Sequence, residues 1–373
     1  MKNQDIKKSI HKLLNFAGIT VNGSNPYDIQ VKNDRFYQRI IHEPALGLGE
    51  AYMDNWWECR ALDQFIAKVL CANLGQVLKK EWRITWNLLT AKLFNQQSSK
   101  RAFMVGQRHY DIGNDLYQGM LDKQMQYTCG YWKDATTLDQ AQEAKLALVC
   151  RKLKLEPGMK VLELGCGFGG FAHYAATRYG VEVTGYTVSK EQVKFAEKLC
   201  KGLPVDIRLA DYRTATGEYD RVLSIGLMEH VGYKNYGTYM KLTNRLLRND
   251  GIALVHTIGR NDSRCACNSW TAKYIFPNGM LPSIAQLGKA MENQFVMEDW
   301  HNFGEDYDKT LMAWYENFRQ VWPKLKDRYN DRFYRMWEYY LLSCAGGFRS
   351  RSMQLWQIVM TKQGTSAPCC RLV

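Results

Sequence analysis

The chain has 373 residues, of which 46% are hydrophobic and 23% charged, a globular composition that excludes a wholly disordered chain. No apolar run reaches the roughly 18 residues that a membrane-spanning helix needs, and the first residues carry no apolar secretory segment, so we expect the chain to stay in the cytoplasm. Lys and Arg outnumber Asp and Glu by 50 to 37. This excess of +13 favours a polyanionic partner, either nucleic acid or an anionic membrane surface, or else serves only solubility.

The 11 cysteines are irregularly spaced, and their odd number without an export signal indicates reduced thiols. Cys265 and Cys267 have no second pair nearby, and neither have Cys369 and Cys370. No metal site is therefore predicted.

Residues 1–98 are expected to form a small, mainly helical domain that contacts lipid, because apolar residues recur there at three- and four-residue spacings. Clusters of Gly, Pro and Asn at 22–26 and 44–49 indicate turns. The first hundred residues hold 14 basic and 9 acidic side chains. Four tryptophans are candidate anchors at a membrane interface: Trp56, Trp57, Trp82 and Trp86.

Residues 79–101 (KKEWRITWNLLTAKLFNQQSSKR) predict a basic amphipathic helix followed by a polar linker. Two interpretations of this helix remain open: its aromatic face packs on its own domain, or it lies on anionic lipid. The polar run 96–99 marks the boundary to a second domain, residues 99–373.

Beyond residue 145, short apolar strands alternate with helices, a pattern that requires a mostly parallel sheet with helices on both faces. The fold class is therefore α/β. Strands are predicted at 161–164, 181–188, 205–209, 221–225 and 252–257, with a helix at 171–179. Residues 295–299 and 355–361 are expected to add the last, antiparallel strands. The aromatic-rich stretch 311–340 predicts a helical insertion over the sheet's functional edge.

The most informative motif is VLELGCGFGG at 161–170, a strand, a glycine turn and a helix. Its spacing differs from the nicotinamide fingerprint, and its E-x-G-x-G-x-G form resembles the first motif of class I S-adenosylmethionine methyltransferases. The loop residues expected to hold the cofactor are Glu163, Gly165, Cys166, Gly167 and Gly169.

Two later strand ends are expected to complete the cofactor site. Thr187, Val188 and Gln192 follow the second strand and are placed to meet the ribose. Asp211 and Tyr212 follow the third strand and are placed to bond and stack on adenine. An alternative for Asp211 is a helix N-cap.

From about Gly18 to Gln357 the chain resembles the bacterial cyclopropane fatty acid synthases. The resemblance rests on long, specific blocks: GLGEAYMDNWWE (47–58), HYDIGNDLY (109–117), MQYTCGYWKDA (125–135), MEHVGYKNY (228–236), HTIG (256–259) and YIFPNG (274–279). One departure is Phe168, where the family usually has tryptophan. The presence of a helical front segment resembles the branch of the family that acts on phospholipids.

The resemblance implies that a methylene group passes from S-adenosylmethionine to the cis double bond of an acyl chain, with a bound bicarbonate as base. The reaction needs an apolar slot, aromatic faces for a carbocation, and the base. The family's bicarbonate ligands correspond here to Cys129, Glu229, His256, Ile258 and Tyr307. Cys129 and Ile258 are expected to contribute backbone N–H groups. Glu229 is expected to accept the ion's own proton and to pair with His230, His256 or a nearby cation.

The resemblance also places Tyr127 and Thr128 over the methionine end of the cofactor. Cys344 matches a cysteine sometimes regarded as catalytic in the family, but the chemistry needs no thiol adduct, so a packing role is favoured. The implied partners are an anionic phospholipid bilayer, contacted from the inner face of the membrane, and a second copy of the chain.

Other readings stay open. Glu229 and His230 form an ordinary surface pair, Cys129 a packing residue and Tyr307 a loop anchor if the site assignment is wrong. A nucleic-acid methyltransferase should show an N-P-P-Y or Pro-Cys motif, and neither occurs, so no nucleic-acid partner is expected. A lipid-binding protein without catalysis, and sister reactions that give methyl-branched or hydroxylated chains, are the remaining alternatives.

Overall fold

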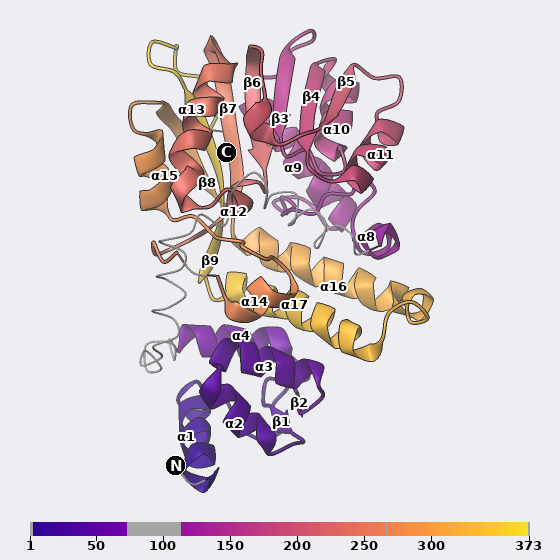
Figure 1. The fold of residues 1–373 in the computed structure, drawn as a ribbon, viewed down its shortest axis with the longest axis vertical. Coiled ribbons are helices and arrows are strands. Elements are labelled where there is room, and N and C mark those ends of the chain that lie inside the picture. Colours follow the sequence, from indigo (N-terminus) through magenta and orange to yellow (C-terminus); the bar gives the residue numbers. More distant parts are fainter. Residues whose placement is uncertain (1–2, 73–112, 266, 372–373) are drawn as a thin grey trace. The chain divides into compact units, whose positions relative to one another are not determined.

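The computed structural model describes residues 3–72, 113–265 and 267–371. The chain divides into two compact units, and each is described by itself (Figure 1). The helical unit comprises residues 1–90, 266–277 and 307–353. The sheet unit comprises residues 91–265, 278–306 and 354–373. The predicted linker at 96–99 and the predicted helix after residue 79 lie outside the described residues.

The helical unit brings the start of the chain together with two later segments. Its elements are α1 (Asn3–Phe16), β1 (Gln30–Val31), α2 (Arg35–His42), α3 (Pro44–Met53), β2 (Trp57–Glu58), α4 (Leu62–Cys71), α14 (Ser269–Tyr274), most of α16 (Glu305–Leu325) and α17 (Asp331–Arg349). The predicted insertion is therefore two helices, α16 and α17, which belong from Tyr307 onward to the same unit as the front helices.

Close contacts explain why α17 and the front helices form one unit. Tyr52 on α3 donates its hydroxyl to Glu338 Oε2 on α17 at 2.6 Å. Gly346 on α17 lies so close to α4 that an added Cβ would stand 2.5 Å from the carbonyl oxygen of Asp63. Arg349 pairs with both Asp63 and Asp308.

Two expectations for the front segment were wrong. Residues 44–53 form a helix rather than a turn, because Pro44 occupies the first helical turn, where proline is tolerated. Gly49 serves close packing, since its Cβ would meet the Trp270 ring at 2.4 Å, a distance that no real contact shows. Trp57 is fully buried and donates to the carbonyl of Leu48 at 3.0 Å, so it cannot anchor a membrane interface. Trp82 and Trp86 lie outside the described residues.

The sheet unit contains a seven-stranded sheet in the order β5-β4-β3-β6-β7-β9-β8. The strands are β3 (Lys160–Leu164), β4 (Glu182–Thr187), β5 (Val205–Leu209), β6 (Tyr219–Ile225), β7 (Leu247–Arg260), β8 (Val296–Asn302) and β9 (Met353–Thr361). Strands β3 to β7 pair in parallel, and β8 pairs antiparallel with β9. The predicted α/β class and the predicted strands are confirmed.

Helices cover both faces of the sheet (Figure 1). The helices and helical turns of this unit are α8 (Asn114–Met120), α9 (Leu138–Lys152), α10 (Gly170–Tyr179), α11 (Lys190–Leu199), η1 (Tyr212–Thr214), α12 (Met228–Val231), η2 (Tyr233–Asn235), α13 (Tyr236–Leu246) and α15 (Ile284–Met291). Side chains of α9 and α10 share a core with Val161, Leu223 and Leu254. Side chains of α13 and α15 share a core with the alternate residues Leu162, Val222 and Ala253.

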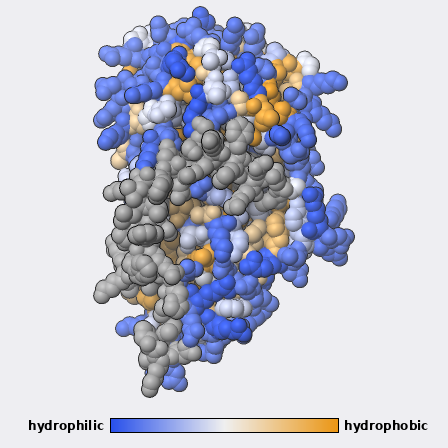
Figure 2. All heavy atoms as spheres, viewed as in Figure 1, coloured by the Kyte–Doolittle hydropathy of each residue, from blue (hydrophilic) through white to orange (hydrophobic). Residues whose placement is uncertain are grey.

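No helix among the described residues is long and apolar enough to cross a membrane. Hydrophilic side chains dominate the face drawn in Figure 2, with apolar side chains in scattered groups. Within the part of the chain that the structure describes, the exposed large hydrophobic residues are Phe16, Leu70, Leu209, Ile284, Val296 and Met297.

Candidate active site

The glycine loop joins β3 to α10 at the carboxyl end of the central strand. Gly165, Gly167 and Gly169 have φ values of +83°, +53° and +80°, which favour glycine. The N–H of Cys166 donates to the carbonyl of Tyr186 on β4 at 2.8 Å, which fixes the loop to the neighbouring strand. A Cβ on Gly167 would meet no atom within 4 Å, so the loop borders open space.

Residues at the ends of β4 and β5 lie at the same edge, because parallel strands end together. The Thr187 hydroxyl donates to Gln192 Oε1 at 2.6 Å, and both residues are buried. Val188 lies between them in the chain and is half-buried. The two side chains predicted to meet a ribose are thus already held together.

Asp211 adopts the alternative role that the sequence left open. Its carboxylate caps η1 by accepting the N–H of Arg213 at 3.0 Å, and it also pairs with the Arg213 side chain at 2.8 and 2.6 Å. The neighbouring ring of Tyr212 lies 5.9 Å from that of Tyr239. Any bond from Asp211 to adenine would have to share a carboxylate that Arg213 already engages.

Glu163, one residue before the end of β3, is buried, and its Oε2 has no hydrogen-bond partner among the described residues. Burial raises the pKa of this carboxyl to about 8, although the Lys145 ammonium opposes the rise. A ligand with a cationic amino group would give this oxygen the partner that it lacks among the described residues, and would favour the ionised carboxylate that burial alone disfavours. The residues present therefore fit S-adenosylmethionine.

Glu229 follows β6 on the short helix α12. Its Oε1 accepts the N–H of Ile258 on β7 at 2.6 Å, while its buried Oε2 has no partner among the described residues. Burial raises the pKa of Glu229 to about 7. Glu229 thus pairs with a backbone N–H and not with the expected histidine or cation. The N–H of Ile258, expected to bind the ion, is already bonded to Glu229.

His256 on β7 is level with Ile225, the last residue of β6. It is buried, its Nδ1 contacts the amide nitrogen of Gln357 at 3.3 Å, and its ring lies 5.9 Å from that of Phe303. Nε2 has no hydrogen-bond partner among the described residues. Burial, with smaller contributions from Lys145 and Lys152, holds the pKa well below its ordinary value, so the imidazole is neutral.

The segment 126–129 carries three of the predicted residues. Tyr127 stacks edge-on against Tyr117 at 5.2 Å between ring centroids. Thr128 accepts from Lys145 at 3.1 Å through its hydroxyl and from Gln142 at 2.7 Å through its carbonyl. Cys129 is fully buried.

Tyr307 and Cys344 belong to the helical unit, so the structure describes them apart from the residues above. The Tyr307 ring is buried and stacks on Phe348 at 4.5 Å between centroids. Burial raises the pKa of the Cys344 thiol to about 12, which works against a nucleophilic thiolate and agrees with a packing role.

Sequence reasoning missed Lys145 and Gln357, two buried polar residues beside the predicted site. Lys145 could have been noticed because its position follows the apolar pattern of residues 138–152, which indicates a buried side chain. Gln357 interrupts the apolar run 355–360 (LWQIVM) of β9 and supplies the contact to His256. No group of three His, Cys, Asp or Glu side chains able to hold a metal ion occurs in the described part of the chain.

Comparisons with known proteins agree on one family. The family model described as mycolic acid cyclopropane synthetase matches residues 97–358. The cyclopropane-fatty-acyl-phospholipid synthase of Escherichia coli K12 is 54% identical over 352 residues, covering 94% of this chain and 92% of its own length.

Two solved structures share the fold. The cyclopropane synthase MmaA2 from Mycobacterium tuberculosis is 28% identical, with a TM-score of 0.66, and covers 70% of this chain and 98% of its own. The mycolic acid cyclopropane synthase CmaA1, solved in complex with SAH and CTAB, is 31% identical with the same TM-score and the same coverage of both chains.

Proposed function

The chain belongs to the cyclopropane synthase family of S-adenosylmethionine-dependent methyltransferases, and we propose that it transfers a methylene group to the cis double bond of unsaturated acyl chains in membrane phospholipids. The observation that carries the proposal is a pair of buried atoms, Glu229 Oε2 and His256 Nε2, that have no hydrogen-bond partner among the described residues. Glu229 follows the carboxyl end of β6, and His256 on β7 is level with that end. These atoms lie on the edge of the sheet that also bears the open glycine loop.

The loop residues Gly165, Gly167 and Gly169, together with Glu163 and the Thr187–Gln192 pair, would hold the cofactor. When bound, S-adenosylmethionine supplies an electrophilic methyl group to the double bond. The attack leaves a carbocation on the acyl chain, and ring closure then needs one proton removed from the transferred methyl group. The chain's own task is to bind, to exclude water and to place a base for this proton.

We propose bicarbonate as that base, held by Glu229 and His256. The raised pKa of Glu229 keeps its carboxyl protonated through much of the neutral range. We therefore propose that Glu229 donates a hydrogen bond to the ion, and not that it accepts the ion's own proton as the sequence led us to expect. We propose that the neutral His256 contacts the same ion through Nε2. Because Ile258 already donates to Glu229, its expected role changes from ion ligand to orienting group. Cys129 and Tyr307 remain proposed ligands, and Cys344 a packing residue.

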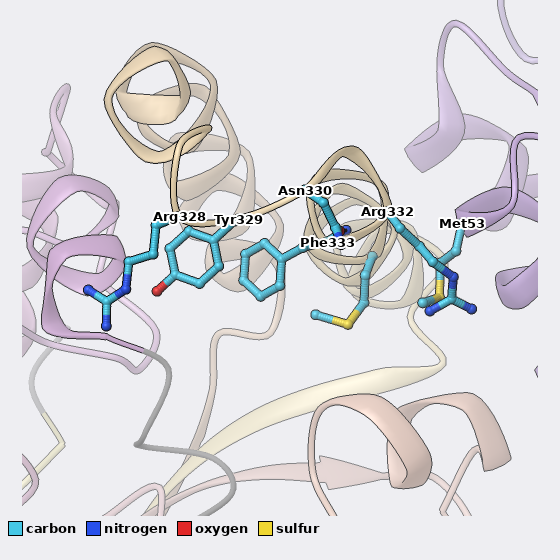
Figure 3. Close-up of a pocket in the computed structure, with 7 residues that line it drawn as sticks. Met53, Arg328, Tyr329, Asn330, Arg332 and Phe333 are labelled. Carbon is cyan, nitrogen blue, oxygen red and sulfur yellow. The ribbon is translucent and has the colours of Figure 1, made fainter.

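We further propose that the helical unit contacts the bilayer through a surface pocket at the turn between α16 and α17. The pocket holds about 300 Å³ and is lined by Met53, Arg328, Tyr329, Asn330, Arg332, Phe333 and Met336 (Figure 3). The rings of Tyr329 and Phe333 stack at 4.4 Å. An aromatic floor with arginines at its rim is complementary to the phosphate and glycerol of an anionic phospholipid.

The family resemblance also implies a homodimer, which sedimentation velocity tests.

The proposed reaction is tested by incubating the purified protein with labelled S-adenosylmethionine and vesicles. We expect label to enter monounsaturated phospholipids and not fully saturated ones of the same headgroup. Transfer to saturated lipid at an equal rate, or to no lipid at all, would refute the proposal.

A further inference from the structure

A cation is buried in the sheet unit, and none of the steps above uses it. Lys145 on α9 has no solvent exposure, and its Nζ donates to Gln126 Oε1 and to Thr128 Oγ1. Both acceptors are neutral side chains. Because a buried ammonium is costly unless its hydrogens are bonded, this placement needs a reason beyond packing.

The lysine acts with a second side chain of α9. Gln142, three residues earlier and therefore on the same side of the helix, donates its amide to the carbonyl of Thr128 at 2.7 Å. From the other direction, Asp122 Oδ1 accepts the N–H of Gln126 at 2.8 Å. The segment 126–128 is thus held at its backbone and at both of its acceptor side chains.

The titratable neighbours of Lys145 come from several elements around the proposed site. Asp122 precedes the segment, Cys129 ends it, Glu163 lies on β3 and His256 on β7. Glu163 shares a face of the sheet with Val161, and His256 with Leu254, because side chains alternate along a strand. That face is the one that α9 covers.

We propose that Lys145 is a positioning residue that fixes the segment 126–129 at the carboxyl edge of the sheet. It holds Tyr127 and Thr128 where they meet the cofactor and Cys129 where it meets the base. This assignment rests on the proposed function. The lowered pKa of Lys145, about 8, agrees with a burial that only these bonds and the acidic neighbours offset.

Lys152 provides a matched control. It lies two turns along α9, is equally buried, and also influences the pKa of His256, but it pairs with Asp299 at 3.0 Å and contacts His301 at 3.1 Å on β8. Both Lys145→Met and Lys152→Met remove a buried charge from the same helix. Only Lys145→Met frees the segment 126–129.

Two readouts on the full-length chain test the proposal. Amide hydrogen exchange of residues 126–129 in the cofactor-free protein should quicken at least tenfold in Lys145→Met and stay within twofold of wild type in Lys152→Met. The dissociation constant for S-adenosylmethionine should rise at least tenfold, and kcat fall at least tenfold, in Lys145→Met alone. Both variants should lose thermal stability.

Gln126→Leu keeps the test decisive if Lys145→Met fails to fold. It removes one acceptor, so it should change exchange and cofactor affinity in the same direction, and the double variant should be no worse than Lys145→Met alone. Unchanged exchange at 126–129, equal effects of Lys152→Met, or additive effects in the double variant would overturn the proposal. If the wild-type chain binds no S-adenosylmethionine, but the variants still differ from it in hydrogen exchange as expected, the proposed function is refuted. The positioning of the segment 126–129 by Lys145 is then still supported.

Discussion

Glu229 is a carboxyl group in surroundings where its charged form is costly, and this gives it a measurable effect on stability. Its pKa is about 7 in the folded chain, against 4.5 for the ordinary group. A raised pKa contributes stability that is fully present below pH 4.5 and is lost as the pH rises through 7.

Glu229→Gln removes this titration and keeps an acceptor for Ile258. Between pH 5 and pH 8, wild type should therefore lose about 2–3 kcal/mol more unfolding free energy than Glu229→Gln does. Urea unfolding of both proteins at the two pH values measures the difference. Parallel pH dependence would show that the carboxyl is not held as described.

The same residue separates chemistry from cofactor binding. Glu229→Gln and His256→Ala should lower kcat about a hundredfold or more, because they disturb the base. Their dissociation constants for S-adenosylmethionine should stay within about threefold of wild type. Calorimetric titration beside steady-state kinetics tests this, and a loss of cofactor affinity as large as that of a glycine-loop variant would contradict the assignment.

Gly167→Val should have the opposite signature. The left-handed φ of +53° strains a β-branched residue, and its side chain would fill the open space assigned to the cofactor. We expect a large loss of S-adenosylmethionine affinity, measured by calorimetry, in a chain that still folds. Unchanged affinity would exclude this loop as the cofactor cradle.

Among the elements, α17 depends on close approach to α4. Gly346→Ala places a Cβ 2.5 Å from the Asp63 carbonyl and should destabilise the helical unit by about 1–3 kcal/mol. Gly288→Ala on α15 is the matched control, because its Cβ meets nothing within 4 Å and should gain up to about 1 kcal/mol. Chemical unfolding of both variants measures the signs, and equal effects would refute the packing argument.

The same contacts between α17 and the front helices mean that the front segment cannot be removed without exposing α17. Removing residues before Lys100 would strip α17 of Tyr52 and of the α4 surface that covers Gly346. A truncated chain would therefore report the loss of a folded unit. Point substitutions on an intact chain are the proper probe of lipid contact.

The sequence alone was enough to predict the strands of the sheet, but not which segments join to form the helical unit. Runs such as Val161–Leu164 and the glycine turn after them are local signals, and their strands lie where predicted. The joining of residues 266–277 and 307–353 to the front helices depends on contacts such as Trp270 with Tyr339, which no local pattern encodes. Burial likewise decided against Trp57 as an anchor and in favour of Lys145 as a site neighbour.

For the whole molecule, the net charge of +13 leads us to expect binding to anionic membranes. Arg328→Glu, at the pocket of the helical unit, should weaken binding to anionic vesicles by about 2 kcal/mol, roughly thirtyfold, and salt should reduce the binding that remains. Arg319→Glu is the control. Arg319 is also exposed and lies over a tyrosine ring, 5.8 Å from Tyr315 against 5.7 Å from Tyr329 for Arg328.

Vesicle co-sedimentation measures both variants, with activity on detergent-dispersed lipid as the check that the sheet unit is intact. Equal weakening by the two substitutions would show that diffuse charge, not the pocket, attracts the bilayer.

In the proposed reaction, a base removes one proton from a methyl group already transferred to the double bond. Mass spectrometry of monounsaturated phospholipid after incubation with S-adenosylmethionine carrying a fully deuterated methyl group tests it most directly. We expect a product that has lost its double bond and gained one carbon with two deuterium atoms, because the third leaves with the base. A product that retains all three deuterium atoms, as a methyl branch or a hydroxylated chain would, contradicts it.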